Sequence, residues 1–311
     1  MVVVLGNLIT DVVFYIESFP VPAQALQGVS RVDMGPGGGC NVAIVASRFG
    51  RMTICLGEVG DDVFGKVVLA GLSREGVNTD FIAVTEGQTP VAGVLVDPAS
   101  EPAYLGYPGT SQLTKTPVSW VNILNRAEAV FVDGWIEHAT TELLISDAVS
   151  IAREARVPIF FDPGPGNPRQ DNRWHRLVAQ KSTVLLANEA EVENLTGTTD
   201  SLEAARTVLK WGNELVVVKR GAKGSYLLTK SEEIESHGFP VIARDTTGAG
   251  DSVAGAIIHG YLLGLSLVDL GLLGNATGAA KVQKIGTGHN LPSPQGVREV
   301  LTCFGKHVKL D

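Results

Sequence analysis

Short apolar segments of strand length alternate with helical patterns through the second half of the chain. The apolar segments cover residues 129–132, 158–161, 183–187 and 215–218, and helical patterns cover residues 142–155 and 202–211. Continuous apolar runs of this length are typical of strands that are buried on both faces of a parallel sheet. Strands that alternate with helices predict a parallel sheet with helices on both of its faces.

The composition excludes several classes of protein. The 311 residues are 44% hydrophobic and 19% charged, which fits a folded globular chain and not a disordered one. The net charge of −8 argues against nucleic acid as a partner. The first residues lack a basic leader, and no apolar run reaches the roughly 18 residues of a membrane span. We therefore expect a cytoplasmic protein without a membrane segment. Its three scattered cysteines argue against disulfides and a zinc site.

A glycine-containing loop, residues 245–251, precedes an apolar segment with helical spacing. Asp245 and the two threonines after it offer N-cap chemistry, so we expect a helix to begin near Gly248. The first amides of a helix lack intrahelical acceptors, and a glycine-lined helix start is a site for anions. Asp251 suits a base that takes a proton from a hydroxyl attacking a phosphate. The alternative is that Asp251 only complements the helix dipole.

A second glycine-rich segment, residues 35–41, precedes a predicted helix over residues 42–49. Its glycines allow a ligand to approach the backbone closely, and Asn41 can both donate and accept hydrogen bonds, which suits a polyol. Asp11 follows the first strand, where polar groups line ligand crevices in open α/β sheets. The alternatives are a flexible turn and a turn aspartate.

Both segments resemble signatures of one family. Asp-Thr-Thr-Gly-Ala-Gly-Asp at 245–251, followed by Gly255 and Ala256, closely resembles the C-terminal signature of the ribokinase-like (PfkB) carbohydrate kinases. Residues 37–43, with Gly50 and Gly60, resemble the N-terminal signature of that family. The resemblance runs from Gly6 to Val300. It implies an α/β fold of the ribokinase-like three-layer sandwich type, with a central, mostly parallel sheet and a small β lid.

The resemblance also implies one kinase domain over residues 1–311, with the lid formed by insertions at about 12–34 and 89–110. Both insertions are β-prone, and Pro20 and Pro22 argue against a helix in the first of them. In many family members the lid pairs between subunits. Because an isolated small sheet needs packing support and its edges invite pairing, we expect a homodimer joined through the lids.

Residue roles follow from the same resemblance. The catalytic residues would be Asp251 as the base and an anion hole of Gly248, Ala249 and Gly250. The sugar-binding residues would be Asp11, Gly38, Gly39 and Asn41. The nucleotide-binding residues would be Asn188, Lys219, Gly221, Gly224, Thr246 and Asn275. Two alternatives stay open: Asn188 and Glu191 also fit a helix N-cap followed by a first-turn acid, and Lys219 also fits a solvated lysine.

Two metal ions belong to the expected chemistry. Glu191 would help to hold Mg²⁺ with ATP through water, because Mg²⁺ prefers oxygen ligands and keeps several waters. In many relatives a potassium ion lies between the Asp-Thr-Thr segment and a later glycine-rich loop. Here that site would involve Asp245, Thr247 and residues 284–290. His289 and Asn290 stand where serine or alanine is common, so the potassium site is left open.

The expected activity is transfer of the γ-phosphoryl group of ATP to a hydroxyl of a small sugar of the ribose, fructose or sugar-acid type. No arginine occurs from Thr89 to Leu113, and a phosphorylated sugar would want cationic partners there. The sugar is therefore expected to be unphosphorylated. One alternative is a nucleoside kinase of the same family. An alternative of another class is a non-catalytic sugar-binding sensor with this fold.

Overall fold

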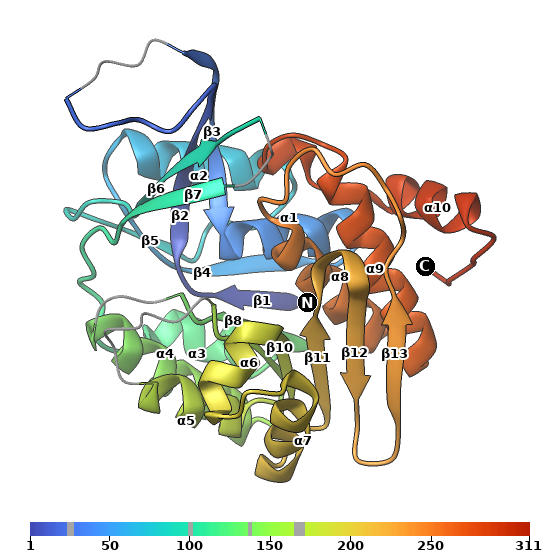
Figure 1. The fold of residues 1–311 in the computed structure, drawn as a ribbon. Coiled ribbons are helices and arrows are strands. Elements are labelled where there is room, and N and C mark those ends of the chain that lie inside the picture. Colours follow the sequence, from blue (N-terminus) through green and yellow to red (C-terminus); the bar gives the residue numbers. More distant parts are fainter. Residues whose placement is uncertain (24–27, 99–101, 136–138, 165–171) are drawn as a thin grey trace.

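A nine-stranded, mostly parallel sheet forms the centre of the molecule (Figure 1). The computed structural model describes residues 1–23, 28–98, 102–135, 139–164 and 172–311. The strand order is β13-β12-β11-β10-β9-β8-β1-β4-β5, and only the pairings of β12 within it are antiparallel. The strands are β1 (Val2–Leu5), β4 (Thr53–Gly60), β5 (Ile82–Thr85), β8 (Ala129–Asp133), β9 (Ile159–Asp162), β10 (Val184–Asn188), β11 (Leu215–Lys219), β12 (Gly224–Leu228) and β13 (Glu233–His237).

Helices cover both faces of this sheet and give it three layers, as the strand and helix patterns predict. One face packs against α1 (Gly39–Arg48), α2 (Val63–Arg74), α8 (Ala249–Leu262), α9 (Leu267–Val282) and α10 (Pro294–Cys303). The other face packs against α3 (Val118–Leu124), α4 (Ala139–Glu154), α5 (Arg173–Lys181), α6 (Glu189–Thr196) and α7 (Ser201–Trp211). Strand β1 is apolar throughout because both of its faces are buried: Val2 and Val4 face one core, and Val3 and Leu5 face the other. No helix in the described part of the chain is long and apolar enough to cross a membrane.

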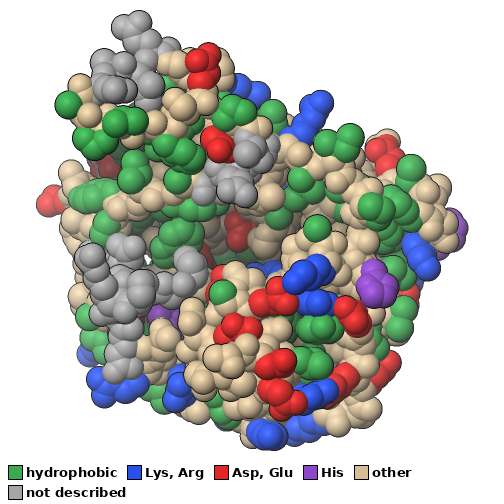
Figure 2. All heavy atoms as spheres, viewed as in Figure 1, with side chains coloured by type: hydrophobic (Ala, Val, Ile, Leu, Met, Phe, Trp, Pro, Cys, Tyr) green, Lys and Arg blue, Asp and Glu red, His purple; other side chains and the backbone are tan. Residues whose placement is uncertain are grey.

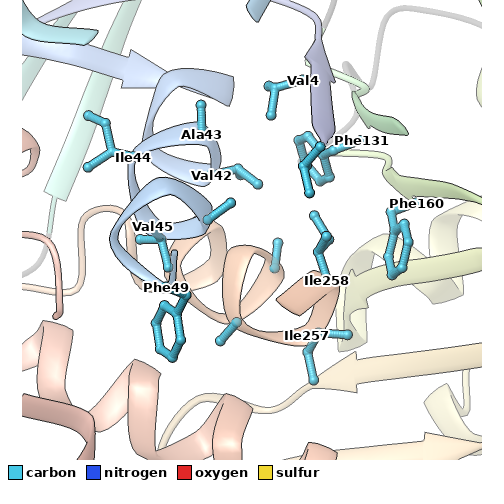
Figure 3. Packing of buried hydrophobic residues seen from close by; sticks show 14 of the residues in the cluster. Val4, Val42, Ala43, Ile44, Val45, Phe49, Phe131, Phe160, Ile257 and Ile258 are labelled. Atoms are coloured by element: carbon cyan, nitrogen blue, oxygen red, sulfur yellow. The ribbon is translucent and has the colours of Figure 1, made fainter. Parts of the chain in front are cut away.

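Helices α1 and α8 pack closely against each other beneath the sheet. Their contact includes Val42 and Val45 of α1, and Ile257 and Ile258 of α8 lie in the same core (Figure 3). Gly255 makes the close approach possible, because a β-carbon there would lie 2.8 Å from Cβ of Val45. The packing fixes the N-terminal ends of both helices relative to each other, and these ends carry the two glycine-rich segments.

A separate four-stranded sheet stands beside the body of the molecule (Figure 1). Its order is β3-β2-β6-β7, with β2 (Leu8–Ile16), β3 (Val29–Gly38), β6 (Val91–Val96) and β7 (Pro102–Tyr107). The strands thus fall largely within the two segments that the sequence assigns to a lid. Residues 24–27 and 99–101 of those segments lie outside the described residues.

The start of α8 differs from the expectation in one respect. The N-cap is Gly248, whose φ of 72° is left-handed, and no side chain caps the helix. The expected capping residue Asp245 instead accepts hydrogen bonds from the backbone amides of Thr247 at 2.8 Å and Gly286 at 2.6 Å. The left-handed turn at Gly248 separates Asp245 from the first turn of α8, so Asp245 does not cap the helix. Its carboxylate instead joins its own segment to the loop that contains Gly286.

Candidate active site

A cavity of about 670 Å³ opens at the carboxyl ends of the parallel strands. Figure 2 shows this face of the molecule hollowed between the small sheet and the body. Strand β1 lies inside the sheet, and the strand order reverses beside it. The chain adds β4 and β5 on one side of β1 and then adds β8 to β11 on the other side. Ligands in open α/β sheets bind outside the carboxyl ends of strands at such a reversal. Polar side chains at or just after the ends of five successive strands line the cavity: Asn7, Asp133, Asp162, Asn188 and Lys219.

Asn41 and Asp251 meet in the wall of the cavity, although 210 positions separate them in the sequence. Nδ2 of Asn41 donates to Oδ2 of Asp251 at 2.8 Å, and Oδ1 of Asn41 is buried without a hydrogen-bond partner among the described residues. Burial raises the pKa of Asp251 to about 6, although the hydrogen bond from Asn41 lowers it. A carboxylate with this pKa is ionised near neutral pH and can accept a proton.

The amides at the start of α8 border the cavity through Gly248, Ala249 and Gly250. The amide of Ala249 already donates to the carbonyl of Thr246 at 3.1 Å. The first amides of a helix have no intrahelical acceptor. An anion bound here would therefore meet the amides of Gly248 and Gly250, whereas the amide of Ala249 is already engaged.

Lys219 points toward this helix start. A β-carbon at Gly250 would lie 3.4 Å from Nζ of Lys219, and Nζ donates to Oδ2 of Asp162 at 2.6 Å. Burial acts to lower the pKa of Lys219, but the carboxylates of Asp162 and Glu191 outweigh it and raise the pKa. Lys219 is thus a partly buried cation that is paired with Asp162 beside the start of α8, and not a solvated lysine.

Acidic and aromatic side chains line the end of the cavity next to the small sheet. Burial raises the pKa of Asp11 and that of Asp133 to about 7. Asp133 accepts hydrogen bonds from the amides of Gly39 at 3.1 Å and Trp135 at 3.0 Å. The rings of Tyr104 and Trp135 meet edge to face with 6.0 Å between centroids. Gly38 also lines this end.

Asn188 and Glu191 form a capping box at the start of α6. The Asn188 side chain accepts a hydrogen bond from the backbone amide of Glu191 at 2.8 Å, and the Glu191 carboxylate accepts one from the backbone amide of Asn188 at 2.6 Å. Both residues also line the cavity. Burial raises the pKa of Glu191 to about 7, although Lys219 lowers it. The helix cap and the cavity wall are therefore the same two residues, so the two interpretations of this motif are compatible.

The opposite end of the cavity lies between α9 and the hairpin β12–β13. Asn275 satisfies its own hydrogen-bonding groups there: it accepts from Ser225 Oγ at 3.0 Å and donates to Ser236 O at 2.9 Å and to His237 O at 3.2 Å. The rest of this end is formed by glycines and apolar side chains, with the Thr246 segment beside it: Gly221, Gly224, Gly238, Phe239, Val241, Gly278 and Ala279.

The Asp245–Thr247 segment lies just before the start of α8, next to the loop after α9. Both Asp245 and Thr247 are buried. The cation found between these two segments is the ammonium group of Lys281, which donates to the carbonyl oxygens of Asp245 at 3.2 Å and Lys284 at 3.1 Å.

Sequence reasoning did not identify several residues of this site. Asp133 and Asp162 end strands that the sequence predicts, so the strand-end rule applied to Asp11 would have found them. Tyr104 and Trp135 meet only through folding, and one sequence cannot show such a pair. Lys281 carries one signal: it is the first charged residue after Asp269 in a helix of small and apolar residues.

Comparisons with known proteins agree with this architecture. The family model described as "pfkB family carbohydrate kinase" matches residues 1–294. The chain is 29% identical over 305 residues to the ribokinase of Mus musculus, covering 94% of this chain and 91% of that protein. It is also 29% identical over 251 residues to an uncharacterized sugar kinase of Archaeoglobus fulgidus, covering 79% of this chain and 97% of that protein.

Solved structures show the same fold. The Arabidopsis thaliana ribokinase complexed with ribose and ATP superposes with a TM-score of 0.83 at 24% identity, covering 96% of this chain and 97% of that chain. The nucleoside kinase of Methanocaldococcus jannaschii superposes with a TM-score of 0.79 at 22% identity, covering 97% of this chain and 98% of that chain.

Proposed function

Because the chain belongs to the pfkB family of carbohydrate kinases and is an ATP-dependent sugar kinase, we propose that it phosphorylates a hydroxyl of a small, unphosphorylated sugar in this cavity. The observation that carries this proposal is the hydrogen bond between Asn41 and Asp251. It places a carboxylate of raised pKa beside both the helix start that suits phosphate and the buried acceptor Oδ1 of Asn41.

In this mechanism Asp251 accepts the proton of the attacking hydroxyl. A free alcohol is far less acidic than a carboxylic acid, so the proton moves late, as the oxygen bonds to phosphorus. The amides of Gly248 and Gly250 and the ammonium of Lys219 face the charge on the transferred group. Asp11, Asp133 and Asn41, with the backbone at Gly38 and Gly39, offer partners for sugar hydroxyls at the same end of the cavity.

The nucleotide would bind between α9 and the β12–β13 hairpin. The glycines at 221 and 224 and the apolar side chains of Phe239, Val241 and Ala279 line this part of the cavity and offer an apolar surface to a base. Asn188 and Thr246 border the path from that space to the anion site. Asn275 holds the hairpin to α9 through its own hydrogen bonds, so it would shape the nucleotide site more than it would bind ATP directly.

Magnesium with ATP fits the residues present. No group of three or more carboxylate, histidine or cysteine ligands occurs among the described residues, and Mg²⁺ commonly takes most of its ligands from phosphates and water. Glu191 and Asp162 would hold it through their carboxylates at the cavity wall. The bound ion supplies neutralisation of phosphate charge. Potassium between Asp245, Thr247 and residues 284–290 does not fit, because the ammonium of Lys281 already holds the carbonyl oxygens there.

The described residues of the cavity include no unpaired cation, which supports an unphosphorylated acceptor. Among the cavity residues that the structure describes, Lys219 is the only cationic side chain, and it is paired with Asp162. A coupled ADP-release assay over sugars, sugar acids, sugar phosphates and nucleosides tests the proposal. Turnover with a neutral or acidic sugar supports it. Sugar binding without turnover across the whole panel would favour the sensor alternative.

A nucleoside acceptor is the second candidate, and the pair of Tyr104 and Trp135 favours it. Aromatic rings at the acceptor end offer a stacking surface to a heterocyclic base. Trp135→Leu distinguishes the two. A nucleoside acceptor would lose affinity through the lost stacking, whereas a small sugar bound by Asp11 and Asn41 would lose little.

The small sheet is proposed to act as a lid and as the surface that joins two copies. Apolar side chains on its outer side are exposed, namely Val29, Val32, Met34, Leu105 and Tyr107. Figure 2 shows hydrophobic side chains at the surface of this part of the molecule. Exposed apolar patches mark association surfaces. Sedimentation should give a dimer at micromolar concentration, and Val32→Lys with Leu105→Lys should give a monomer. A cytoplasmic location is also proposed, and three cysteines without disulfides support it.

A further inference from the structure

Lys281 is a fully buried lysine near the C-terminal end of α9, beneath the anion site. Burying an ammonium is costly unless it is hydrogen-bonded and compensated. Two backbone carbonyls take its hydrogen bonds, that of Asp245 at 3.2 Å and that of Lys284 at 3.1 Å. These carbonyls belong to the two segments that border the start of α8. A lysine in this place therefore bridges the same elements that a bound alkali cation would bridge.

We infer that the ammonium group of Lys281 is a built-in cation that holds the anion site in shape, so that phosphoryl transfer needs no added monovalent ion. Lys281 touches no cavity surface, so it is a positioning residue and not a catalytic one. This inference rests on the proposed kinase function of the site.

The surroundings suit a fixed positive charge. The last carbonyls of a helix and its dipole favour a cation at the C-terminal end. Burial lowers the pKa of Lys281 and the nearby charge of Lys284 adds to this, whereas the carboxylates of Asp245 and Asp251 act in the opposite direction and favour the charged form. The ammonium also offsets part of the negative charge that these two buried aspartates place near a bound phosphate.

The contacts connect Lys281 to the anion site through Asp245. Its carbonyl accepts from Lys281, while its carboxylate accepts the amides of Thr247 and Gly286. The amide of Arg244 donates to the carbonyl of Val282 at 2.7 Å. Together these bonds fix the segment that turns into α8 at Gly248 against the end of α9. Without the ammonium, two carbonyl oxygens would face each other beneath this turn with no cation between them.

A potassium ion cannot share the place. It would need the oxygens of Asp245 and Lys284, and it would lie within a few ångströms of a buried ammonium. Two like charges at such a distance repel each other strongly, and the repulsion is larger when they are buried. The lysine and the ion are therefore alternatives for one position.

Turnover in different salts tests the inference. Wild-type ADP release is measured at fixed ionic strength with saturating Mg·ATP and sugar in potassium, sodium and tetramethylammonium chloride. We expect equal rates in all three. In tetramethylammonium, Lys281→Ala should lower kcat by about 10²-fold, the effect of a displacement near 1 Å at a reacting group. Potassium should restore part of that loss with saturation, because alanine leaves space for an ion.

Lys281→Met is the matched variant, since its side chain fills the space without a charge; it should lose activity and gain nothing from potassium. Lys306→Ala removes an exposed lysine and should match wild type in every salt. A several-fold, saturating activation of wild type by potassium would overturn the inference, and so would full activity of Lys281→Ala in tetramethylammonium.

Melting temperatures measured without substrate separate this inference from the kinase function. Potassium should raise the melting temperature of Lys281→Ala relative to tetramethylammonium, and should not change that of wild type or Lys281→Met. This result would support the built-in cation even if no acceptor in the panel were turned over. If wild type turned over sugar but Lys281→Ala melted at the same temperature in all salts and kept full activity, only the inference would fail.

Discussion

The two ends of the cavity treat their polar groups in opposite ways. At the end formed by the small sheet and the start of α8, burial raises the pKa of Asp11 and Asp133 to about 7 and that of Asp251 to about 6. At the end between α9 and the β12–β13 hairpin, the side chain of Asn275 instead forms hydrogen bonds with other residues of the protein. The remaining surface there consists largely of glycines and apolar side chains. At the first end, burial of the carboxylates costs folding free energy. At the second end, the side chain of Asn275 already has hydrogen-bond partners within the protein.

This difference separates proton chemistry from shape recognition. A carboxyl group whose pKa is raised by folding binds more protons in the folded than in the unfolded state between about pH 4 and its folded pKa. The stability that such a group contributes therefore falls as pH rises through that window. The acidic end thus makes the fold less stable near neutral pH, which is the condition in which an ionised base is available. The hairpin end carries no such cost.

The largest expected effect comes from breaking the acidic end at Asp251. Asp251→Asn should lower kcat by about 10²–10⁴-fold, the usual contribution of a positioned acid–base group. The same change should raise the melting temperature by a few degrees, because an amide is buried at lower cost than a carboxylate and can still accept from Asn41. Steady-state kinetics and thermal unfolding measure both effects.

Asp61→Asn is the matched control, since it makes the same exchange at a carboxylate that is 73% exposed. It should leave kcat and the melting temperature unchanged. If Asp251→Asn keeps near wild-type turnover with the true acceptor, Asp251 is not the base, and the acidic end has another purpose.

A somewhat smaller effect is expected at Lys219, which joins the two ends. Lys219→Met removes the cation beside Gly250 and leaves Asp162 buried without its partner. We expect kcat/KM to fall by about 10²-fold, comparable to the loss of one donor to a transition-state anion. Lys223→Met, an exposed lysine on the next turn, should change it little. Equal losses in the two variants would show that overall charge, and not position, matters.

The sequence predicts the framework that creates these two ends. Apolar runs such as 2–5 and 215–218 are buried on both faces, so the alternation of strands and helices is enough to predict the three layers. The signatures at 37–43 and 245–251 also predict two segments that the fold brings together, and the bond between Asn41 and Asp251 confirms that they meet. Gly255 is part of the reason, because it lets the two helices approach.

The sequence does not reveal how each polar group is used inside the fold. Asp245 looks like a helix cap but ties Thr247 to Gly286, since Gly248 turns the chain away from it. Asn275, which the sequence assigns to the nucleotide, also holds the hairpin through its side-chain hydrogen bonds. Lys281 looks like an ordinary helix lysine, and its burial depends on loops 36 residues and 3 residues away. Hydrogen bonds of this kind depend on three-dimensional geometry that local patterns do not contain.

Acid should weaken catalysis by roughly tenfold over one pH unit. Asp251 must be ionised to accept a proton, and burial raises its pKa to about 6. Below that value kcat/KM should fall about tenfold per pH unit, and above pH 7 it should be flat. Protonation of Asp11 and Asp133 near pH 7 would bend the profile earlier if those groups must be ionised. A profile that stays flat down to pH 5 would contradict a role for Asp251 as base.

The smallest effect on activity is expected at the hairpin end. It sharpens the comparison because a change there should leave the rate of phosphoryl transfer unchanged. Asn275→Ala removes the hydrogen bonds that join α9 to Ser225, Ser236 and His237. Losing them should cost about 1–3 kcal/mol of unfolding free energy, measured in urea. We expect KM for ATP to rise several-fold because the hairpin loosens, and kcat at saturating ATP and sugar to stay the same. Asn122→Ala, at an exposed position on α3, serves as the control. A fall in kcat as large as the rise in KM would mean that the two ends act as one unit and that the separation drawn from their polar groups is wrong.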